Sequence, residues 1–211
     1  MALSRLKRLR ARVFPFPKDI RGPLRYLRAY SELETHTMRP TAHESSVRKY
    51  GKVFLKTFPR IKKPHKGIEL EIKISETHHE AKLGIVINYG TVDLAAAKLG
   101  FTKTRVVVES IQGLIKGNHA RAELHRLTTT LGMPWPNALL HQIESHAQAC
   151  GFKEVIIRLP ETMYYYTKPS DVGLRPKDPE AIRAGMRKFY ARVAEANGYV
   201  SDGKEFYVKR L

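Results

Sequence analysis

Residues 131–157 constrain the fold more strongly than any other stretch of this chain. They read LGMPWPNALLHQIESHAQACGFKEVII, which is a short loop with two prolines, an amphipathic segment, a glycine and an apolar run. Gly151 is of the residue type that ends helices. The pattern predicts a helix over residues 136–150 and a buried strand over residues 153–159. The apolar face of the helix recurs at helical spacing: Leu139, Leu140, Ile143 and Ala147.

Three other segments have the patterns of strands. Residues 68–74 (IELEIKI) alternate apolar and charged side chains, which is typical of a half-exposed strand. Residues 83–89 (LGIVINY) and 104–111 (TRVVVESI) are more continuously apolar, and we place them near the centre of a sheet. We interpret the run between them, residues 92–101 (VDLAAAKLGF), as a short helix ended by Gly100.

The C-terminal third predicts a helix and a hairpin. Asp178 and Pro179 have the residue types of an N-cap and a first helical position, and Asn197 with Gly198 ends the helix. A small hairpin follows, turning through residues 202–203. With a helix over residues 120–132, these elements predict an α/β or α+β fold: a mixed central sheet, packed helices and a C-terminal hairpin.

Two short segments complete the prediction. Residues 53–58, with Val53, Leu55 and Phe58, are read as a short strand. The tyrosines 164–166 are read along a strand, so that Tyr165 faces away from its neighbours.

The charge of the chain is large and uneven. The sequence holds 38 Lys and Arg against 20 Asp and Glu, a formal net charge of +18. Residues 1–66 account for 18 bases and 4 acids, and residues 67–211 for 20 bases and 16 acids. We therefore divide the chain into a basic N-terminal extension, 1–66, and a nearly balanced domain, 67–211. Such an excess indicates a polyanionic partner, and nucleic acid or a ribonucleoprotein fits it best.

Two basic clusters in the extension are the candidate phosphate contacts. The first, SRLKRLRAR, contains Arg5, Lys7, Arg8, Arg10 and Arg12, and the second, RIKKPHK, contains Arg60, Lys62, Lys63 and Lys66. Leucines at helical spacing in the first cluster leave a membrane-surface helix open as an alternative. We expect no transmembrane segment and a cytoplasmic location, or an organellar matrix if residues 1–17 are a transit peptide.

Cysteine and histidine usage does not indicate a metal centre. Cys150 is the single cysteine, which excludes an intramolecular disulfide and a Cys-based cage. The cluster ETHHE at residues 76–80 lacks the i,i+4 histidine pair of the HExxH motif, and His141 and His146 are five residues apart. We predict no metal site.

The order of elements, with ALLHQIESHAQACGFKEVII and RKFYARVAEANGY, resembles the GNAT acyl-CoA N-acyltransferase fold. The resemblance covers residues 67–211. It implies a GNAT-like mixed sheet, a loop that binds the coenzyme A pyrophosphate through successive backbone N–H groups, and transfer of an acyl group from acetyl-CoA to an amine. Residues 1–66 have no counterpart in the resemblance.

The implied cofactor loop departs from the family pattern. Aligning the paired leucines 139–140 places Gly132, Pro134 and Pro136 across it, and proline has no N–H to donate. Gly132 and Asn137 are the cofactor-binding candidates if acyl-CoA binds. The sequence therefore predicts a cofactor loop that is degenerate, and no cofactor is expected.

The resemblance also implies two catalytic candidates. Glu109, on the strand before the loop, matches the family's general base, and its alternative reading is a strand-end carboxylate paired with a basic residue. Tyr190 lies near the position of the general acid, although four residues before Gly198 stands Ala194, and Tyr190 also fits the apolar face of its helix.

Two function hypotheses follow from the sequence. The first is a GNAT-like protein that docks on nucleic acid or a ribonucleoprotein through phosphate contacts and without acyl-CoA catalysis. The second is a working N-acetyltransferase whose basic extension recruits an acidic substrate. The sequence leaves open whether the chain is an enzyme.

Overall fold

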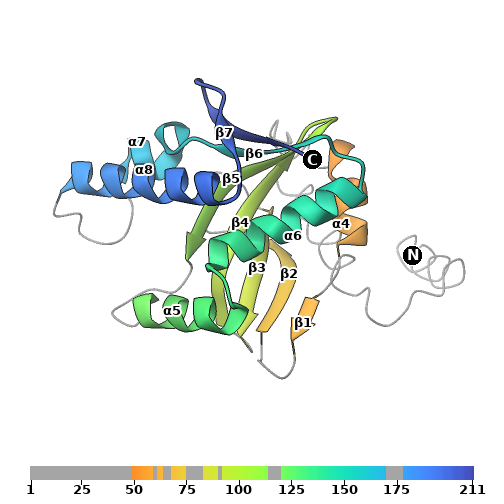
Figure 1. Cartoon of the computed structure of the whole chain (residues 1–211), viewed down its shortest axis with the longest axis horizontal. Coiled ribbons are helices and arrows are strands. Elements are labelled where there is room, and N and C mark those ends of the chain that lie inside the picture. Colours follow the sequence, from red (N-terminus) through yellow and green to blue (C-terminus); the bar gives the residue numbers. More distant parts are fainter. Residues whose placement is uncertain are drawn as a thin grey trace, which may run out of the picture.

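A computed structural model describes residues 49–58, 61–63, 68–74, 83–89, 92–113, 120–169 and 178–211 (Figure 1). Within these ranges the chain forms an eight-stranded sheet with helices. The strands are β1 (Ile61–Lys63), β2 (Ile68–Ile74), β3 (Leu83–Tyr89), β4 (Val92–Phe101), β5 (Arg105–Gly113), β6 (Glu154–Arg158), β7 (Val200–Ser201) and β8 (Phe206–Arg210). The helices are α4 (Lys52–Thr57), α5 (Ala120–Leu131), α6 (Trp135–Ala149), α7 (Tyr164–Thr167) and α8 (Pro179–Ala196), and a 3-10 turn spans Pro160–Thr162.

The sheet is mixed, with the order β1-β2-β3-β4-β5-β6-β8-β7. Strands β1 to β5 are antiparallel neighbours in chain order. β5 and β6 are parallel, and the crossover between them carries α5 and α6. β8 pairs antiparallel with β6 and with β7, which closes the chain as a hairpin. The predicted mixed sheet with packed helices and a C-terminal hairpin is confirmed.

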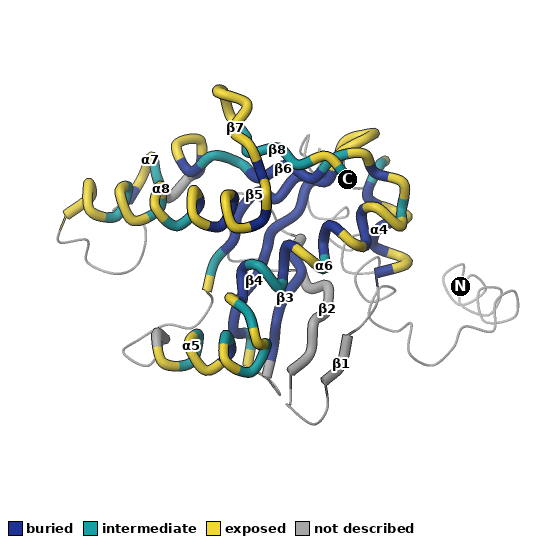
Figure 2. The backbone as a smooth tube through the Cα atoms, in the orientation of Figure 1, coloured by how far each residue is buried: buried dark blue, intermediate teal, exposed yellow. Residues whose placement is uncertain are grey.

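The core lies between one face of the sheet and the helices that cover it. Figure 2 shows buried strands beneath helices that are exposed on their outer sides. Alternate residues along β4 and β5 enter this core, as their period of two requires. The same cluster includes Phe54 of α4, Leu127 of α5, Leu139 of α6 and Tyr190 of α8. One continuous core therefore joins these four helices to the sheet. No helix among the described residues combines the length and apolarity needed to cross a bilayer.

The two long helices begin and end as their sequences predict. The side chain of Asp178 accepts a hydrogen bond from the Glu180 N–H at 2.9 Å, which caps α8. Gly151 and Gly198, which follow α6 and α8, have positive φ values of 82° and 74°. A glycine takes this left-handed conformation without a steric penalty, so both helices stop there.

The helix predicted over residues 92–101 is wrong, because these residues form the central strand β4. Its three alanines have high helix propensity, but every residue from Leu94 to Phe101 is buried between β3 and β5. Burial on both faces suits a continuous apolar run in a central strand, and tertiary pairing overrides the intrinsic preference.

Two predicted strands are helices. Residues 52–57 form α4, whose Phe54 and Leu55 are buried. The tyrosines 164–166 belong to α7. A three- or four-residue apolar cluster is too short for its period to distinguish a strand from one helical turn.

Part of the segment that we assigned to the N-terminal extension belongs to the folded body. Phe54 is 0% exposed, and its ring centroid lies 5.3 Å from that of Phe101 at the end of β4. β1 pairs with β2 across the predicted boundary at residue 66. Helix α4 and strand β1 therefore extend the sheet and its core toward the N-terminus.

Candidate functional site

The candidate catalytic residue Glu109 is the extra residue of a β-bulge. Lys98 pairs with Ser110 and Leu99 pairs with Val108, so no β4 residue stands opposite Glu109. Bulges redirect a side chain out of the regular alternation of the strand. The parallel ladder between β5 and β6 ends at the pair Val108↔Ile157, one residue before Glu109.

Glu109 forms an ion pair with the residue that occupies the corresponding place on β6. The Nε of Arg158 donates to Oε2 of Glu109 at 2.6 Å, and the two side chains are 28% and 10% exposed. The guanidinium carbon of Arg158 also lies 5.4 Å from the ring centroid of Phe206. Arg158 neutralises the carboxylate and occupies one of its oxygens, so this arrangement matches the structural alternative for Glu109.

Tyr190 is a core residue whose hydroxyl serves the backbone of β5. The Ile111 N–H donates to the Tyr190 oxygen at 2.8 Å, and the Tyr190 hydroxyl donates to the Ile111 carbonyl at 3.2 Å. Ile111 lies beyond the end of the β5–β6 ladder, where β6 offers no partners. Tyr190 therefore satisfies two backbone groups that would otherwise be buried without hydrogen bonds. The structure brings both catalytic candidates to the same stretch of β5, Glu109–Ile111.

The loop between α5 and α6 has few free backbone donors. Gly132, at φ 75°, donates its N–H to the carbonyls of Thr128 and Thr129 at 3.0 and 3.2 Å. Asn137 donates its N–H to the Pro134 carbonyl at 2.9 Å. Pro134 and Pro136 have no N–H. The N–H groups of both cofactor candidates, Gly132 and Asn137, are therefore bonded within the chain, and the two prolines supply none.

The side chain of Asn137 is also engaged. Its Oδ1 accepts a hydrogen bond from Nδ2 of Asn197 at 3.1 Å, and the same Nδ2 donates to the Val193 carbonyl at 2.7 Å. Trp135 and Phe189 stack beside this contact, with ring centroids 6.1 Å apart. The start of α6 is thus packed against the end of α8 through Asn137, whereas Gly132 bonds to the last carbonyls of α5.

The sequence interpretation missed two polar residues at the bulge. Lys98 is 0% exposed, which is rare for lysine, and Ser110 is 4% exposed. They are cross-strand partners. Ser110 Oγ has no hydrogen-bond partner among the described residues. A charge inside an apolar run was the available signal for Lys98, but the interpretation of residues 92–101 as a short helix did not single it out.

His146 links α4 to α6. Its Nε2 lies 2.8 Å from the Phe54 carbonyl, one of the groups that a helix end leaves without an internal partner. Burial lowers the pKa of His146, and the hydrogen bond to Phe54 opposes this only in part. Nε2 also lies 3.5 Å from Sγ of Cys150 and 3.3 Å from Oγ1 of Thr57. Because Nε2 must carry the proton that binds the carbonyl, it is not a base for the thiol.

A buried carboxylate holds the C-terminal hairpin on α6. Glu144 accepts hydrogen bonds from the Tyr199 hydroxyl at 2.8 Å and from Lys209 Nζ at 2.6 Å. Burial and the neighbouring Glu144 raise the pKa of Tyr199, so its hydroxyl stays protonated and donates. Both carboxylate oxygens are paired, which makes this network structural.

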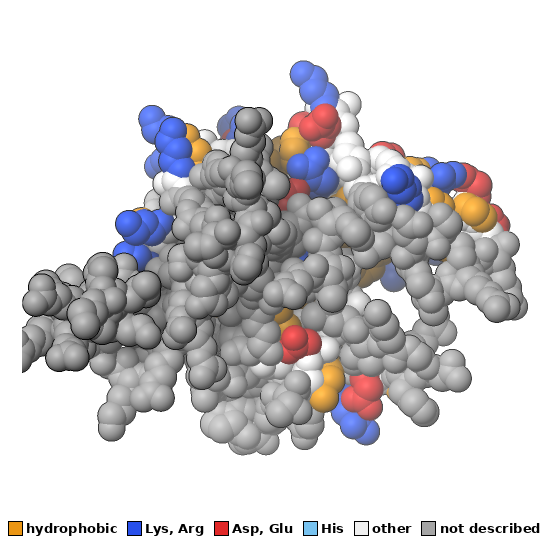
Figure 3. Space-filling model, turned by 180° about the vertical axis from the view of Figure 1, so that it is seen from behind, with side chains coloured by type: hydrophobic (Ala, Val, Ile, Leu, Met, Phe, Trp, Pro, Cys, Tyr) orange, Lys and Arg blue, Asp and Glu red, His pale blue; other side chains and the backbone are white. Residues whose placement is uncertain are grey.

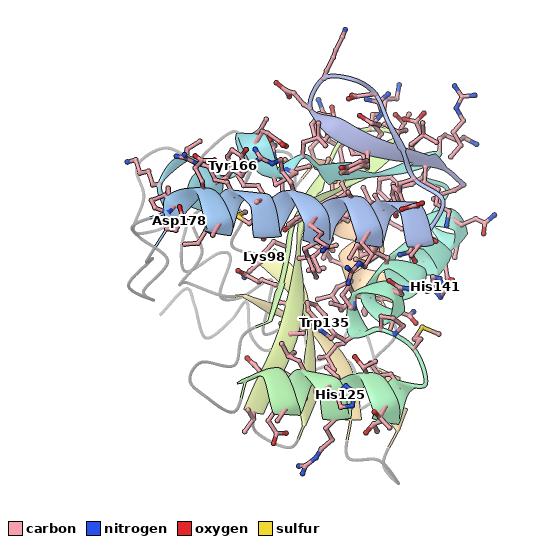
Figure 4. All side chains as sticks on the ribbon, turned by 60° about the vertical axis from the view of Figure 1, so that its left-hand side comes forward. Lys98, His125, Trp135, His141, Tyr166 and Asp178 are labelled. Carbon is pink, nitrogen blue, oxygen red and sulfur yellow. The ribbon has the colours of Figure 1, made fainter. Side chains whose placement is uncertain are left out.

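Figure 4 shows His125 on α5 and His141 on α6, well separated and not pointing toward one another. Among the described residues no three His, Cys, Asp or Glu side chains converge into a group that could hold a metal ion. The cluster at residues 76–80 lies outside the described residues.

The structure does not describe the side chains of the residues that we predict to contact phosphates. Arg5, Lys7, Arg8, Arg10, Arg12, Arg60 and Lys66 lie outside the described residues, and Lys62 and Lys63 are described only as part of β1. The comparisons with models of protein families, with curated proteins and with solved structures found no match to this chain.

Proposed function

We propose that this chain docks on nucleic acid or a ribonucleoprotein through phosphate contacts, as a GNAT-like protein without acyl-CoA catalysis. The observation that carries the proposal is the charge: +18 overall, of which residues 1–66 supply 18 bases against 4 acids. A polyanion neutralised by such a surface releases its counterions, which gives strong and salt-dependent binding without sequence readout.

The state of the α5–α6 loop argues against acyl-CoA binding. Pro134 and Pro136 lack N–H groups, and the N–H groups of Gly132 and Asn137 are bonded to carbonyls of the chain. A hydrogen bond to a charged group contributes about 1.5–3 kcal/mol. Two missing donors would weaken the binding of a pyrophosphate by roughly two to four powers of ten.

The polar groups of the two catalytic candidates already make contacts within the fold. Arg158 is paired with Glu109 at 2.6 Å. The Tyr190 hydroxyl is bonded to both backbone groups of Ile111. A general base or acid needs a free lone pair or proton that points at the substrate. Both side chains are better explained as parts of the fold.

One observation favours the alternative, a working N-acetyltransferase that uses acetyl-CoA. The described elements β5, α6, β6, α8 and the closing hairpin follow one another in the order that the resemblance implies. Glu109 also sits in a bulge, where side chains are often redirected toward a site. A shared architecture is not a shared function, so this order supports the fold more than the activity.

Two measurements on the full chain test the proposal. Fluorescence anisotropy with a labelled nucleic acid should show binding that weakens steeply between about 50 and 200 mM salt. Reversing Arg5, Arg8, Arg10 and Arg12 to glutamate should lower that affinity. Isothermal titration with acetyl-CoA should show no binding at micromolar concentrations.

Each hypothesis has its own refuting outcome. Micromolar acetyl-CoA affinity, together with turnover that is lost in Glu109→Ala, would replace docking with acyl transfer. Binding to anionic liposomes but to no nucleic acid, lost when residues 1–13 are removed, would favour the membrane-surface helix.

A further inference from the structure

The folded part of the chain carries a second concentration of positive charge. It lies where α4, the β4–β5 turn, the α6–β6 loop and the end of β8 meet. Figure 3 shows Lys and Arg side chains gathered on the left, the side on which α4 lies when the molecule is seen from behind. We call this surface the basic edge. Its members are all exposed: Lys49, Lys52, Lys56, Lys103, Arg105, Lys153 and Arg210.

Specific contacts hold these separate segments together. The ring centroid of Phe54 lies 5.3 Å from that of Phe101 and 6.2 Å from that of Phe152, which fixes α4 against the turn and the loop. Lys153 donates its N–H to the Thr104 carbonyl at 2.8 Å, and Leu211 donates its N–H to the Lys153 carbonyl at 2.9 Å. The charges of the basic edge therefore sit on a rigid frame.

The basic edge has little internal neutralisation. Glu154 is the only acidic side chain in residues 49–58, 101–105, 150–155 and 206–211. It lies 2.5 Å from Arg105 and 3.9 Å from Arg210, so both arginines share one carboxylate. Within the described part of the chain, none of the five lysines of the edge forms an ion pair. Like charges crowded on one edge repel one another, and a bound polyanion relieves that repulsion.

The chemistry of the basic edge fits phosphates better than bases. Its free charges are lysines, which act as point charges without the bidentate geometry that reads guanine. Stacking on unpaired bases requires exposed aromatic rings. Here Phe54, Phe58, Phe101 and Phe152 are buried, and Lys49 Nζ lies 5.1 Å from the ring centroid of the half-buried Tyr50. No described aromatic side chain on this edge offers a stacking platform.

We propose that the basic edge binds the phosphate backbone of duplex nucleic acid without reading its sequence. The proposal rests on the proposed function and names the partner's form and the surface that meets it. Lysines from three elements, Lys56, Lys103 and Lys153, contact separate phosphates. Three lysines of the edge, Lys49, Lys52 and Lys56, belong to the basic segment 1–66, and residues 49–66 contain seven bases and no acid.

The test compares two variants of the full chain with equal changes of net charge. The edge variant carries Lys56→Glu, Lys103→Glu and Lys153→Glu. The control variant carries Lys188→Glu, Arg192→Glu and Lys204→Glu, three exposed positions on α8 and on the hairpin turn away from the edge. Anisotropy of a labelled mixed-sequence DNA duplex, and of one of its strands alone, is measured between about 50 and 200 mM salt.

The wild type should bind the duplex more tightly than the single strand. Loss of three phosphate contacts should lower the slope of log K against log salt by about 2.7 in the edge variant, at about 0.9 per contact. The control should change the slope by less than about 0.9, which is the value for one phosphate contact. A variant with glutamine at the same three positions should show the same loss of slope, and thermal melts should show that all variants are folded.

The outcomes separate the edge from the general proposal. Duplex binding by the wild type that is equally affected in both variants overturns the role of the edge and leaves docking by the extension intact. Tighter binding to the single strand overturns the preference for a duplex. Absence of any nucleic-acid binding by the wild type overturns both proposals.

Discussion

The hydroxyl of Tyr190 lies 2.8 Å from the backbone nitrogen of Ile111 and 3.2 Å from its carbonyl oxygen. A side chain on α8 thus takes the place that a neighbouring strand would fill beside β5. The β5–β6 ladder ends at Val108↔Ile157, while β5 runs on to Gly113. Four properties of the fold can be tested from this and related contacts.

Replacing Tyr190 with phenylalanine should destabilise the protein without disturbing the packing of the ring. Both polar groups of Ile111 would lose their partner inside the core, at a cost of about 1–3 kcal/mol. Urea unfolding of Tyr190→Phe measures this cost. Tyr207→Phe is the matched control, because the Tyr207 hydroxyl makes no hydrogen bond within the described residues, and it should change stability by less than about 0.5 kcal/mol. Equal effects would refute the bracing role of Tyr190.

The ion pair between Glu109 and Arg158 should contribute more to stability than the one between Glu154 and Arg105. Arg158 and Glu109 are 28% and 10% exposed, whereas Arg105 is 48% exposed. Glu109→Gln should cost about 1.5–3 kcal/mol, and Glu154→Gln less than about 1 kcal/mol.

A double-mutant cycle with Arg158→Gln should show that most of the loss at Glu109 is coupled to Arg158. No coupling would mean that the carboxylate is held for another purpose, and catalysis would return as the leading explanation for Glu109.

Protonation of His146 should weaken the fold as the solution becomes acidic. Its pKa lies below the ordinary 6.5 because burial penalises the cation. Below pH 6.5 the unfolded chain therefore binds more protons at this residue than the folded chain does. The stability that neutral His146 contributes is complete above this pH and is lost as the pH falls toward the lower pKa of the folded state. Urea midpoints at neutral and mildly acidic pH should differ less in His146→Gln than in the wild type. His141→Gln, at an exposed site on the same helix, should keep the full difference.

Helix α4 should behave as part of the folded body. Phe54 is 0% exposed and Val53, on the same helix, is 57% exposed. Phe54→Ala should cost about 3–5 kcal/mol, and Val53→Ala less than about 0.5 kcal/mol. Thermal or urea unfolding of the two variants measures the contrast. A small loss at Phe54 would restore the division of the chain at residue 66.

Much of the fold is predictable from local signals. The apolar face of α6, the Asp178 cap of α8 and the glycines at 151 and 198 each specify a helix boundary through short-range chemistry. The segments that form β3, β5 and β6 are apolar runs of the length that is typical of strands. The basic character of the N-terminal third is a matter of composition alone.

The errors occur where distant parts of the chain decide the conformation. The alanines of β4 prefer a helix in isolation and become a strand because β3 and β5 flank them. The partner of Glu109 also could not be predicted, because it comes from a distant part of the chain. Arg158 is adjacent to it only through the parallel register of Val108 with Ile157, which no local pattern encodes. The position of Tyr190 on the apolar face of its helix predicts a core residue, but nothing in the sequence predicts its hydrogen bonds to Ile111.

The contact between His146 and the Phe54 carbonyl has a consequence for the charged parts of the chain. It pins α4 to α6, and residues 1–48 are covalently joined to the body at that point. Residues 1–48 and the basic edge are thus joined at the start of α4. A duplex captured by either would meet the other at a high effective concentration, so their joint avidity should exceed the affinity of each.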